Sequence, residues 1–262
     1  MRHLTLDDIP RACELSASAG WNQTPSDWER MIKLEPFGCF CVEEDDRLVA
    51  TTTLLTYGRD LAWVGMVLTH VDYQRRGHAR LLVTAALELS IVRNIRCVKL
   101  DATDQGRSLY ESLGFVEEQP IERWSGRPVL HRPASAEFGP SPLFQLDLAA
   151  FGADRSRFLN TLGPSMIAGG AFAMCRDGAR SNHMGPCVAR DQESAARVIR
   201  GALATKPGEP WLWDILPSNQ PACELAQQLG FEPVRRLTRM VRGPSLRGAE
   251  RMVYATAGFE AG

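Results

Sequence analysis

Apolar and polar positions alternate along the first half of the chain in a way that predicts successive strands. Four apolar runs rich in β-branched or aromatic residues predict strands at residues 37–42, 48–56, 63–69 and 97–102. The polar run 43–47 separates the first two and predicts a hairpin turn. After residue 77 the apolar side chains recur three and four positions apart, at Leu81, Leu82, Ala85, Ala86, Leu89 and Val92. This spacing predicts a helix with one buried face.

Helical patterns flank these strands on both sides. Residues 7–35 are predicted to be helical, with Pro25 and Pro36 as breaks. Residues 108–113 predict a short helix that Gly114 closes in the C-cap position. Strands interleaved with helices predict an α/β fold, of the α+β type, whose cleft lies near the strand ends.

The second half of the chain repeats the pattern of the first. Residues 125–142 are rich in proline and glycine, which predicts a linker or extended connector. Beyond it, residues 225–231 echo residues 109–115, ending in the same Leu-Gly-Phe triplet. Predicted strands at 171–175, 184–189 and 211–216 and a helix at 191–203 precede the echo. We therefore expect two similar domains, 1–127 and 143–262, joined by a linker at 128–142.

Composition excludes several classes of protein. The 262 residues are 44% hydrophobic and 23% charged, as is usual for a globular protein, and the formal net charge of −1 argues against a broad nucleic-acid-binding face. The seven cysteines are odd in number and form no C-x-x-C pair, so neither a zinc site nor a disulfide framework is predicted. The chain has no signal-like start and no apolar run of about 18 residues. We expect a cytoplasmic protein.

The strongest chemical signal lies at residues 67–80. There a strand-like run leads into a basic, glycine-containing turn, and a helix follows directly. The first N–H groups of a helix lack intrahelical partners and carry partial positive charge, which suits a pyrophosphate. Gly77 allows a close backbone approach, and Arg75, Arg76 and Arg80 add positive charge around it.

Residues 1 to about 125 resemble the GNAT superfamily of acyl-CoA-dependent N-acetyltransferases. The first family motif stands here as Gln74-Arg75-Arg76-Gly77-His78-Ala79. The second spans residues 103–110 and is followed by Gly114 and Phe115. Two positions depart from the family pattern, since Thr103 stands where asparagine is usual and Gly106 where alanine is usual.

The resemblance implies that acetyl-CoA binds as the acyl donor. The backbone of residues 67–69 would bind the pantetheine amides as an added strand would, and the turn would hold the pyrophosphate. The implied cofactor-binding residues are Val67, Leu68, Thr69, Gln74, Arg75, Arg76, Gly77, His78, Ala79, Arg80, Gly106 and Ser108. The five histidines are scattered without ligand spacing, so no metal site is predicted.

The resemblance also suggests catalytic and acceptor-binding residues. Tyr110 is the expected general acid, because a phenol of pKa about 10 can donate its proton to a departing thiolate. Asp101 is the main candidate for the base, acting directly or through water, although a carboxylate there could equally cap nearby amides. His70 is a weaker candidate. Trp21 and Asn22 are expected to line the acceptor pocket, with simple packing as the alternative for Trp21.

The C-terminal half resembles a degenerate GNAT domain. Residues 190–195 bring two acidic side chains where the phosphate turn would be, and these would repel a pyrophosphate. The family asparagine is kept as Asn219, whereas Ala226 replaces the tyrosine. This half is therefore not expected to bind CoA.

These observations predict an N-acetyltransferase that moves an acetyl group to the amine of a small molecule, such as an amino acid, a polyamine or an aminoglycoside-like compound. The amine would attack directly within a ternary complex. The alternative is a non-catalytic acyl-CoA-binding or sensing protein, which the substitutions at 103 and 106 motivate. A third interpretation makes the C-terminal half an assembly or regulatory module. The expected partner is a small-molecule amine, with no nucleic acid and no membrane; a homodimer is left open.

Overall fold

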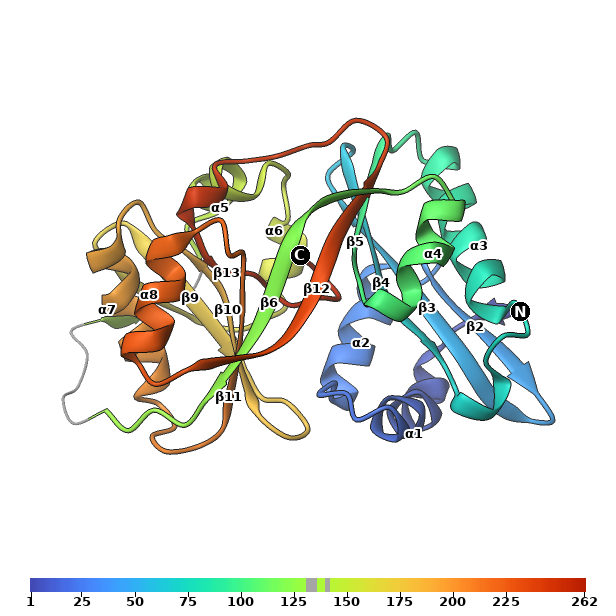
Figure 1. Cartoon of the computed structure of the whole chain (residues 1–262), viewed down its shortest axis with the longest axis horizontal. Helices are drawn as coiled ribbons and strands as arrows, with labels where there is room; N and C mark the ends of the chain where they lie inside the picture. Colours follow the sequence, from blue (N-terminus) through green and yellow to red (C-terminus); the bar gives the residue numbers. More distant parts are fainter. Residues whose placement is uncertain (131–135, 140–141) are drawn as a thin grey trace.

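The computed structural model describes residues 1–130, 136–139 and 142–262 (Figure 1). Its strands join into one thirteen-stranded mixed sheet, ordered β1-β2-β3-β4-β5-β12-β6-β11-β10-β9-β8-β7, with β13 paired to β10. Helices flank the sheet in both halves, with α1 to α4 in the N-terminal half and α5 to α8 in the C-terminal half. The predicted α/β class is confirmed.

The N-terminal half follows the predicted order closely. It contains β1 (Arg2–His3), α1 (Ile9–Ser18), α2 (Pro25–Leu34), β2 (Cys39–Glu44), β3 (Arg47–Tyr57), β4 (Leu61–Thr69), α3 (His78–Val92), β5 (Cys97–Ala102), α4 (Asp104–Ser112) and β6 (Val116–Gly126). The four predicted strands are confirmed as β2 to β5, with ends that differ by two residues or fewer. Helix α4 starts earlier than predicted, because the Thr103 hydroxyl caps it by accepting a hydrogen bond from the Gly106 N–H (3.2 Å).

The C-terminal half repeats this order, which confirms the predicted duplication. It contains β7 (Glu137–Gly139), α5 (Phe144–Phe151), α6 (Ser156–Leu159), β8 (Ser165–Ala168), β9 (Ala171–Arg176), β10 (Asn182–Val188), α7 (Gln192–Leu203), β11 (Trp211–Ile215), α8 (Gln220–Gln228), β12 (Glu232–Arg242) and β13 (Val253–Ala255). The predicted linker at 128–142 begins just after β6 ends at Gly126 and contains all of β7. Residues 131–135 and 140–141 of that stretch lie outside the described residues.

Strand β6 of the N-terminal half and strand β12 of the C-terminal half are exchanged between the two halves. Strand β12 lies between β5 and β6 and runs antiparallel to both, so that it completes the sheet of the N-terminal half. Strand β6 in turn pairs with β11 of the C-terminal half. Figure 1 shows the crossing, with green β6 beside red β12 in the centre of the molecule. The sequence pattern did not predict this exchange.

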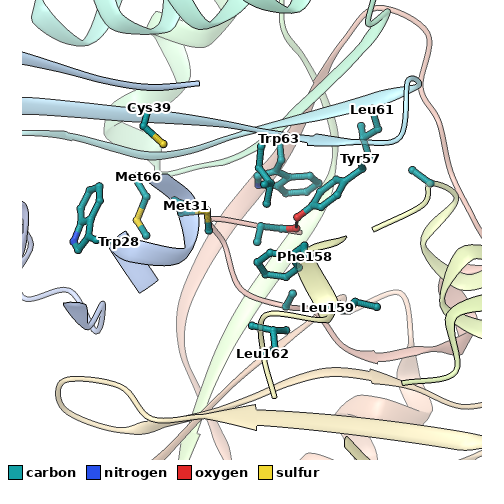
Figure 2. Close-up of a cluster of buried hydrophobic side chains, with 14 of the residues drawn as sticks. Trp28, Met31, Cys39, Tyr57, Leu61, Trp63, Met66, Phe158, Leu159 and Leu162 are labelled. Atoms are coloured by element: carbon teal, nitrogen blue, oxygen red, sulfur yellow. Dashed lines mark hydrogen bonds between the residues drawn. The ribbon is translucent and has the colours of Figure 1, made fainter. Parts of the chain in front are cut away.

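A shared core holds the two halves together. Tyr57 of β3 and Trp63 of β4 point toward the α6 segment of the other half, where Phe158 meets the Tyr57 ring edge-on at 6.1 Å (Figure 2). The same buried cluster contains residues of α2, α5 and β9. Burial of apolar side chains from both halves in one cluster means that each half stabilises the other.

Strand β4 bends away from β5 partway along its length. The two strands pair in parallel only from Leu61 to Trp63. Beyond that point β4 carries a bulge, where Met66 adopts a positive φ of 51° and its carbonyl accepts a hydrogen bond from the Thr51 hydroxyl (2.8 Å). A wedge therefore opens between residues 64–69 of β4 and residues 100–102 of β5.

The exchange predicts that residues 1–130 do not fold alone. That fragment keeps β5 and β6 but lacks β12, so both strands would expose unpaired edges. We expect the fragment 1–130 to show no cooperative thermal transition by circular dichroism. A cooperative transition should return when a separate chain of residues 143–262 is added. A fragment that melts cooperatively near the temperature of the whole chain would contradict the interdependence of the halves.

Candidate active site

A pocket of about 390 Å³ occupies the wedge and reaches both faces of the sheet. Leu100 and Asp101 are neighbours on β5, so their side chains point to opposite faces, and both residues line the pocket. Leu100 belongs to the apolar cluster of the α3 and α4 face, which also contains Tyr110. Asp101 points toward β12 and the C-terminal half. A ligand entering from one face can thus meet a ligand on the other.

Tyr110 projects from α4 into this pocket. Its side chain is buried, and no described residue hydrogen-bonds its hydroxyl. The ring packs closely on Gly106, where an added Cβ would lie 3.0 Å from Cε2 of the tyrosine. The glycine that departs from the family pattern therefore makes room for the ring. Burial raises the pKa of the Tyr110 phenol, so the group stays protonated around neutral pH.

The basic turn precedes α3 as the sequence predicted. Gly77 adopts a φ of 87°, which favours glycine, and helix α3 starts at His78. The first helical hydrogen bond runs from the Leu81 N–H to the Gly77 carbonyl (2.9 Å), so the amides of residues 78–80 precede it. A Cβ at Gly77 would meet no described atom within 4 Å. The positive φ at this position, rather than a lack of space for a side chain, therefore requires glycine.

The arginine side chains around this turn differ in the partners that they bind. Arg76 stacks over Tyr73 at 4.7 Å and pairs with Glu44 (3.2 Å), so part of its charge is neutralised. The Arg80 guanidinium donates to the Ser112 hydroxyl (2.8 Å). Arg75 forms no ion pair with any described residue. Arg75 and Arg80 thus keep their charge for an anion.

The remaining residues of the implied cofactor site lie around the wedge. Val67 lines the pocket. Leu68 and Thr69 pair with β3 along one edge of β4, and the other edge of β4 faces the wedge at these residues. The Gln74 amide donates a long hydrogen bond to the Thr69 carbonyl (3.4 Å). Ser108 is exposed on α4.

Asp101 lines the pocket as a member of a buried ion pair. Its oxygens accept from Nε (2.9 Å) and Nη2 (3.1 Å) of Arg239, which β12 supplies and which stacks over Trp63. The Asp101 side chain is completely buried. Burial raises the pKa of this carboxyl, and Arg239 opposes the shift. Asp101 therefore helps to anchor the exchanged strand.

Trp21 and Asn22 lie in the loop between α1 and α2, and both line the pocket. Trp21 also packs against the core shared by the two halves. The Asn22 side chain accepts hydrogen bonds from the N–H groups of Arg180 and Ser181 and donates to the Ser181 carbonyl (2.8–3.0 Å). The amide thus fastens the β9–β10 loop of the C-terminal half onto the N-terminal half. His70 lies outside the pocket, in a separate surface cleft beside Arg47.

The segment 257–262 also contributes to the pocket, which the sequence pattern did not predict. This segment lies against β4, where the Glu260 carbonyl would be 2.4 Å from a Cβ at Gly65. It brings Phe259 and Glu260 into the pocket wall. Glu260 Oε1 pairs with Arg176 (2.5 Å), and its other oxygen accepts a long hydrogen bond from the Gln23 amide (3.4 Å). Burial raises the pKa of the Glu260 carboxyl. No local sequence signal marks these contacts, because they form only in the folded chain.

The equivalent wedge of the C-terminal half is filled by the chain itself. Strand β10 pairs with β11 only from Asn182 to Met184 and then bends, as β4 does. The space beyond is taken by β13, which pairs with β10. Asn219, at the position of the family asparagine, donates to the carbonyls of Arg251 (3.1 Å) and Val253 (2.9 Å). The chain's own backbone thus occupies the place that an extended ligand would take.

At the start of α7, a backbone N–H group is likewise bound by a side chain of this chain. Asp191 caps the helix by accepting a hydrogen bond from the Ser194 N–H (2.8 Å), and this bond holds the pKa of the carboxyl below its usual value. A fixed carboxylate there repels a phosphate. Within residues 1–130, 136–139 and 142–262, no three potential ligand side chains cluster as a metal site would require. No helix in that part of the chain is long and apolar enough to span a membrane.

The buried pair predicts a large stability cost for Asp101→Asn. Loss of the carboxylate charge leaves the buried Arg239 without its main partner, which costs about 3–5 kcal/mol of unfolding free energy. Urea unfolding would measure it. Asp104→Asn is the matched control, because that side chain is exposed and its loss should cost about 1 kcal/mol or less. Equal values for the two variants would contradict the anchoring role.

Comparisons with known proteins agree with this architecture. The sequence model of the Acetyltransferase (GNAT) family matches residues 6–115, and that of the Acetyltransferase (GNAT) domain matches residues 143–255. The uncharacterized N-acetyltransferase YitH of Bacillus subtilis (strain 168) is 28% identical over 241 residues, covering 83% of this chain and 82% of that protein.

Two solved structures share the fold. A putative acetyltransferase from Pyrococcus horikoshii superposes with a TM-score of 0.89 at 24% identity, covering 100% of this chain and 95% of the other. A tandem GNAT protein from the clavulanic acid biosynthesis pathway gives a TM-score of 0.64 at 14% identity, with coverages of 93% and 98%. The chain therefore belongs to the GNAT acetyltransferase family and carries two GNAT domains in tandem.

Proposed function

We propose that the protein transfers an acetyl group from acetyl-CoA to the amine of a small molecule. The observation that carries this proposal is the pocket in the open wedge of the N-terminal half, which reaches both faces of the sheet and contains Tyr110. The donor enters from the α3 and α4 face and the acceptor from the face that the C-terminal half covers. A pocket of this volume suits a small molecule better than a nucleic acid or a membrane surface.

The donor extends along the wedge from the basic turn to the pocket. Its pantetheine amides pair with the free edge of residues 67–69, and its pyrophosphate binds the amides of residues 78–80 with Arg75 and Arg80 nearby. Gly106 and Ser108 lie on the α4 side of this path. Thr103 caps α4 and Gly106 accommodates Tyr110, so both departures from the family motif have structural roles. They give no support to a purely sensory protein.

The reaction proceeds by direct attack. The amine nitrogen attacks the thioester carbonyl carbon, the tetrahedral intermediate collapses, and the carbon–sulfur bond breaks. Tyr110 donates a hydrogen bond and then its proton to the departing sulfur. The raised pKa of the phenol makes that transfer uphill, so positioning against the sulfur must provide the advantage. Among the described residues no cysteine lines the pocket, which argues against an acyl-enzyme.

Two carboxylates line the pocket and could take the proton of the amine. The sequence suggested Asp101, whereas the hydrogen bonds favour Glu260, because Arg239 binds both oxygens of Asp101. Glu260 has one oxygen bound only by a long hydrogen bond from Gln23. Its raised pKa also makes it a stronger base than an ordinary glutamate. We assign proton removal to Glu260.

The C-terminal half does not bind CoA in this account. It completes the active site by providing β12, the β9–β10 loop and the segment 257–262. An exclusively regulatory role for this half does not explain why its residues form the acceptor wall.

Acetyl-CoA should stabilise the protein against thermal unfolding. A ligand at about 100 times its dissociation constant adds roughly 2.7 kcal/mol to the native state. Gly77→Glu should abolish the shift, because it places a carboxylate beside the pyrophosphate. Gly163→Glu is the matched control, since Gly163 has a similar φ of 93° and equally open surroundings. Equal ligand-induced shifts in the two variants would place the donor elsewhere.

Tyr110→Phe should retain donor binding and lose turnover. The variant keeps the ring that packs on Gly106 but removes the proton donor, so we expect kcat to fall about 100-fold or more. Thiol release would report turnover, and the thermal shift with acetyl-CoA would report binding. Tyr254→Phe, which removes a hydroxyl in the C-terminal half, should leave both unchanged. Wild-type kcat in Tyr110→Phe would exclude the phenol as the acid.

A further inference from the structure

The charged side chains that line the pocket are unequally neutralised. Five such side chains take part: Asp101, Arg123, Arg180, Arg235 and Glu260. Three of them have close partners of opposite charge. Asp101 pairs with Arg239, Arg123 with Asp214, and Glu260 with Arg176.

Arg180 and Arg235 have no such partner among the described residues. Both come from the C-terminal half, and neither forms an ion pair in the described part of the chain. Arg235 lies in register with Arg123 of β6, so two guanidinium groups neighbour each other. The Arg235 side chain stays largely exposed at this wall, and its partial burial and the neighbouring cation Arg123 lower its pKa. The pocket therefore carries an excess of positive charge that a bound anion would relieve.

The excess lies on the acceptor face. Arg235, Leu237 and Arg239 alternate along β12 and share one face, and Arg239 reaches Asp101 from there. That face is opposite to Leu100, which packs with Tyr110. The Arg180 guanidinium lies near Gly20, next to Trp21 in the α1–α2 loop. The CoA phosphates in the proposed function bind at the start of α3, so these two arginines are left for the acceptor.

We propose, resting on the acetyltransferase function above, that the acceptor is an amine that also carries an anionic group, either a carboxylate or a phosphate. Arg180 and Arg235 bind the anion through charge-assisted hydrogen bonds. The apolar part of the molecule packs against Trp21, Leu237 and Phe259, and its ammonium group faces Glu260. Polyamines and aminoglycosides, which carry only positive charge, are poor acceptors in this site because the two arginines repel them.

Matched acceptor pairs test this assignment by thiol release from acetyl-CoA. L-leucine is compared with L-leucinamide, and O-phosphoethanolamine with ethanolamine, so that the members of each pair differ in the anionic group. We expect kcat/KM to be at least about 10-fold higher for the anionic member of one pair. The pair that responds distinguishes a carboxylate from a phosphate.

Variants then link the preference to the two arginines. Arg235→Gln and Arg180→Gln should each lower kcat/KM for the preferred anionic acceptor by about 10- to 100-fold, with little change for its neutral partner and for the KM of acetyl-CoA. Arg236→Gln is the matched control, because Arg236 is the next residue on β12 and does not line the pocket. It should leave the ratio within each pair unchanged.

The assay results bear differently on the anionic acceptor and on the acetyltransferase function on which that proposal rests. The inference is overturned if neutral amines or spermidine react faster than the anionic acceptors and Arg235→Gln does not change the kcat/KM ratio within each pair. That result leaves the acetyltransferase activity intact. Failure of every amine to release thiol contradicts the proposed function instead.

The anion site is then tested by calorimetric titration of N-acetyl-L-leucine and N-acetyl-L-leucinamide into CoA-saturated protein. Equal affinities for the acid and the amide, together with no detectable binding of inorganic phosphate, overturn the anion site. Weaker binding of the acid to Arg235→Gln supports it.

Discussion

Strand β12 runs between β5 and β6, and its hydrogen bonds to both join the two halves into one sheet. Because of this pairing, Arg239 reaches Asp101 across the boundary between the halves, and Arg235 and Leu237 enter the wall of a pocket that opens in the other half. The sheet of the N-terminal half is incomplete without β12, and one wall of the pocket is incomplete without the same strand. Folding and the construction of the site therefore depend on one set of backbone pairings.

The duplicated fold contains the same wedge twice, in two different states. In both halves the central parallel pair separates after three residues, at β4 and β5 and at β10 and β11. In the N-terminal half the wedge is a pocket that contains Tyr110. In the C-terminal half β13 fills it, held by Asn219. The segment that closes the second wedge continues into residues 257–262, which form part of the wall of the first. The same stretch of chain thus fills one wedge and forms part of the wall of the pocket in the other.

The sequence predicted the local structure of both halves well, because strand alternation, helical spacing and caps are local properties. It also identified the basic turn at Gly77 and the position of Tyr110, since both belong to short motifs. The exchange of β12 could not be predicted in this way, because β6 and β12 have the same pattern whichever sheet they join. The partner of Asp101, the hydrogen bonds of Asn22 and the approach of Glu260 to Gly65 are contacts between residues more than 130 positions apart along the chain. Only the folded chain brings them together.

We infer that one wedge accepts the donor while the chain itself occupies the other. A crystal structure of the protein with acetyl-CoA tests it most directly. We expect one cofactor per chain, with its pantetheine between β4 and β5, its pyrophosphate at the start of α3, and β13 still paired to β10. Cofactor density between β10 and β11, with β13 displaced, would contradict it.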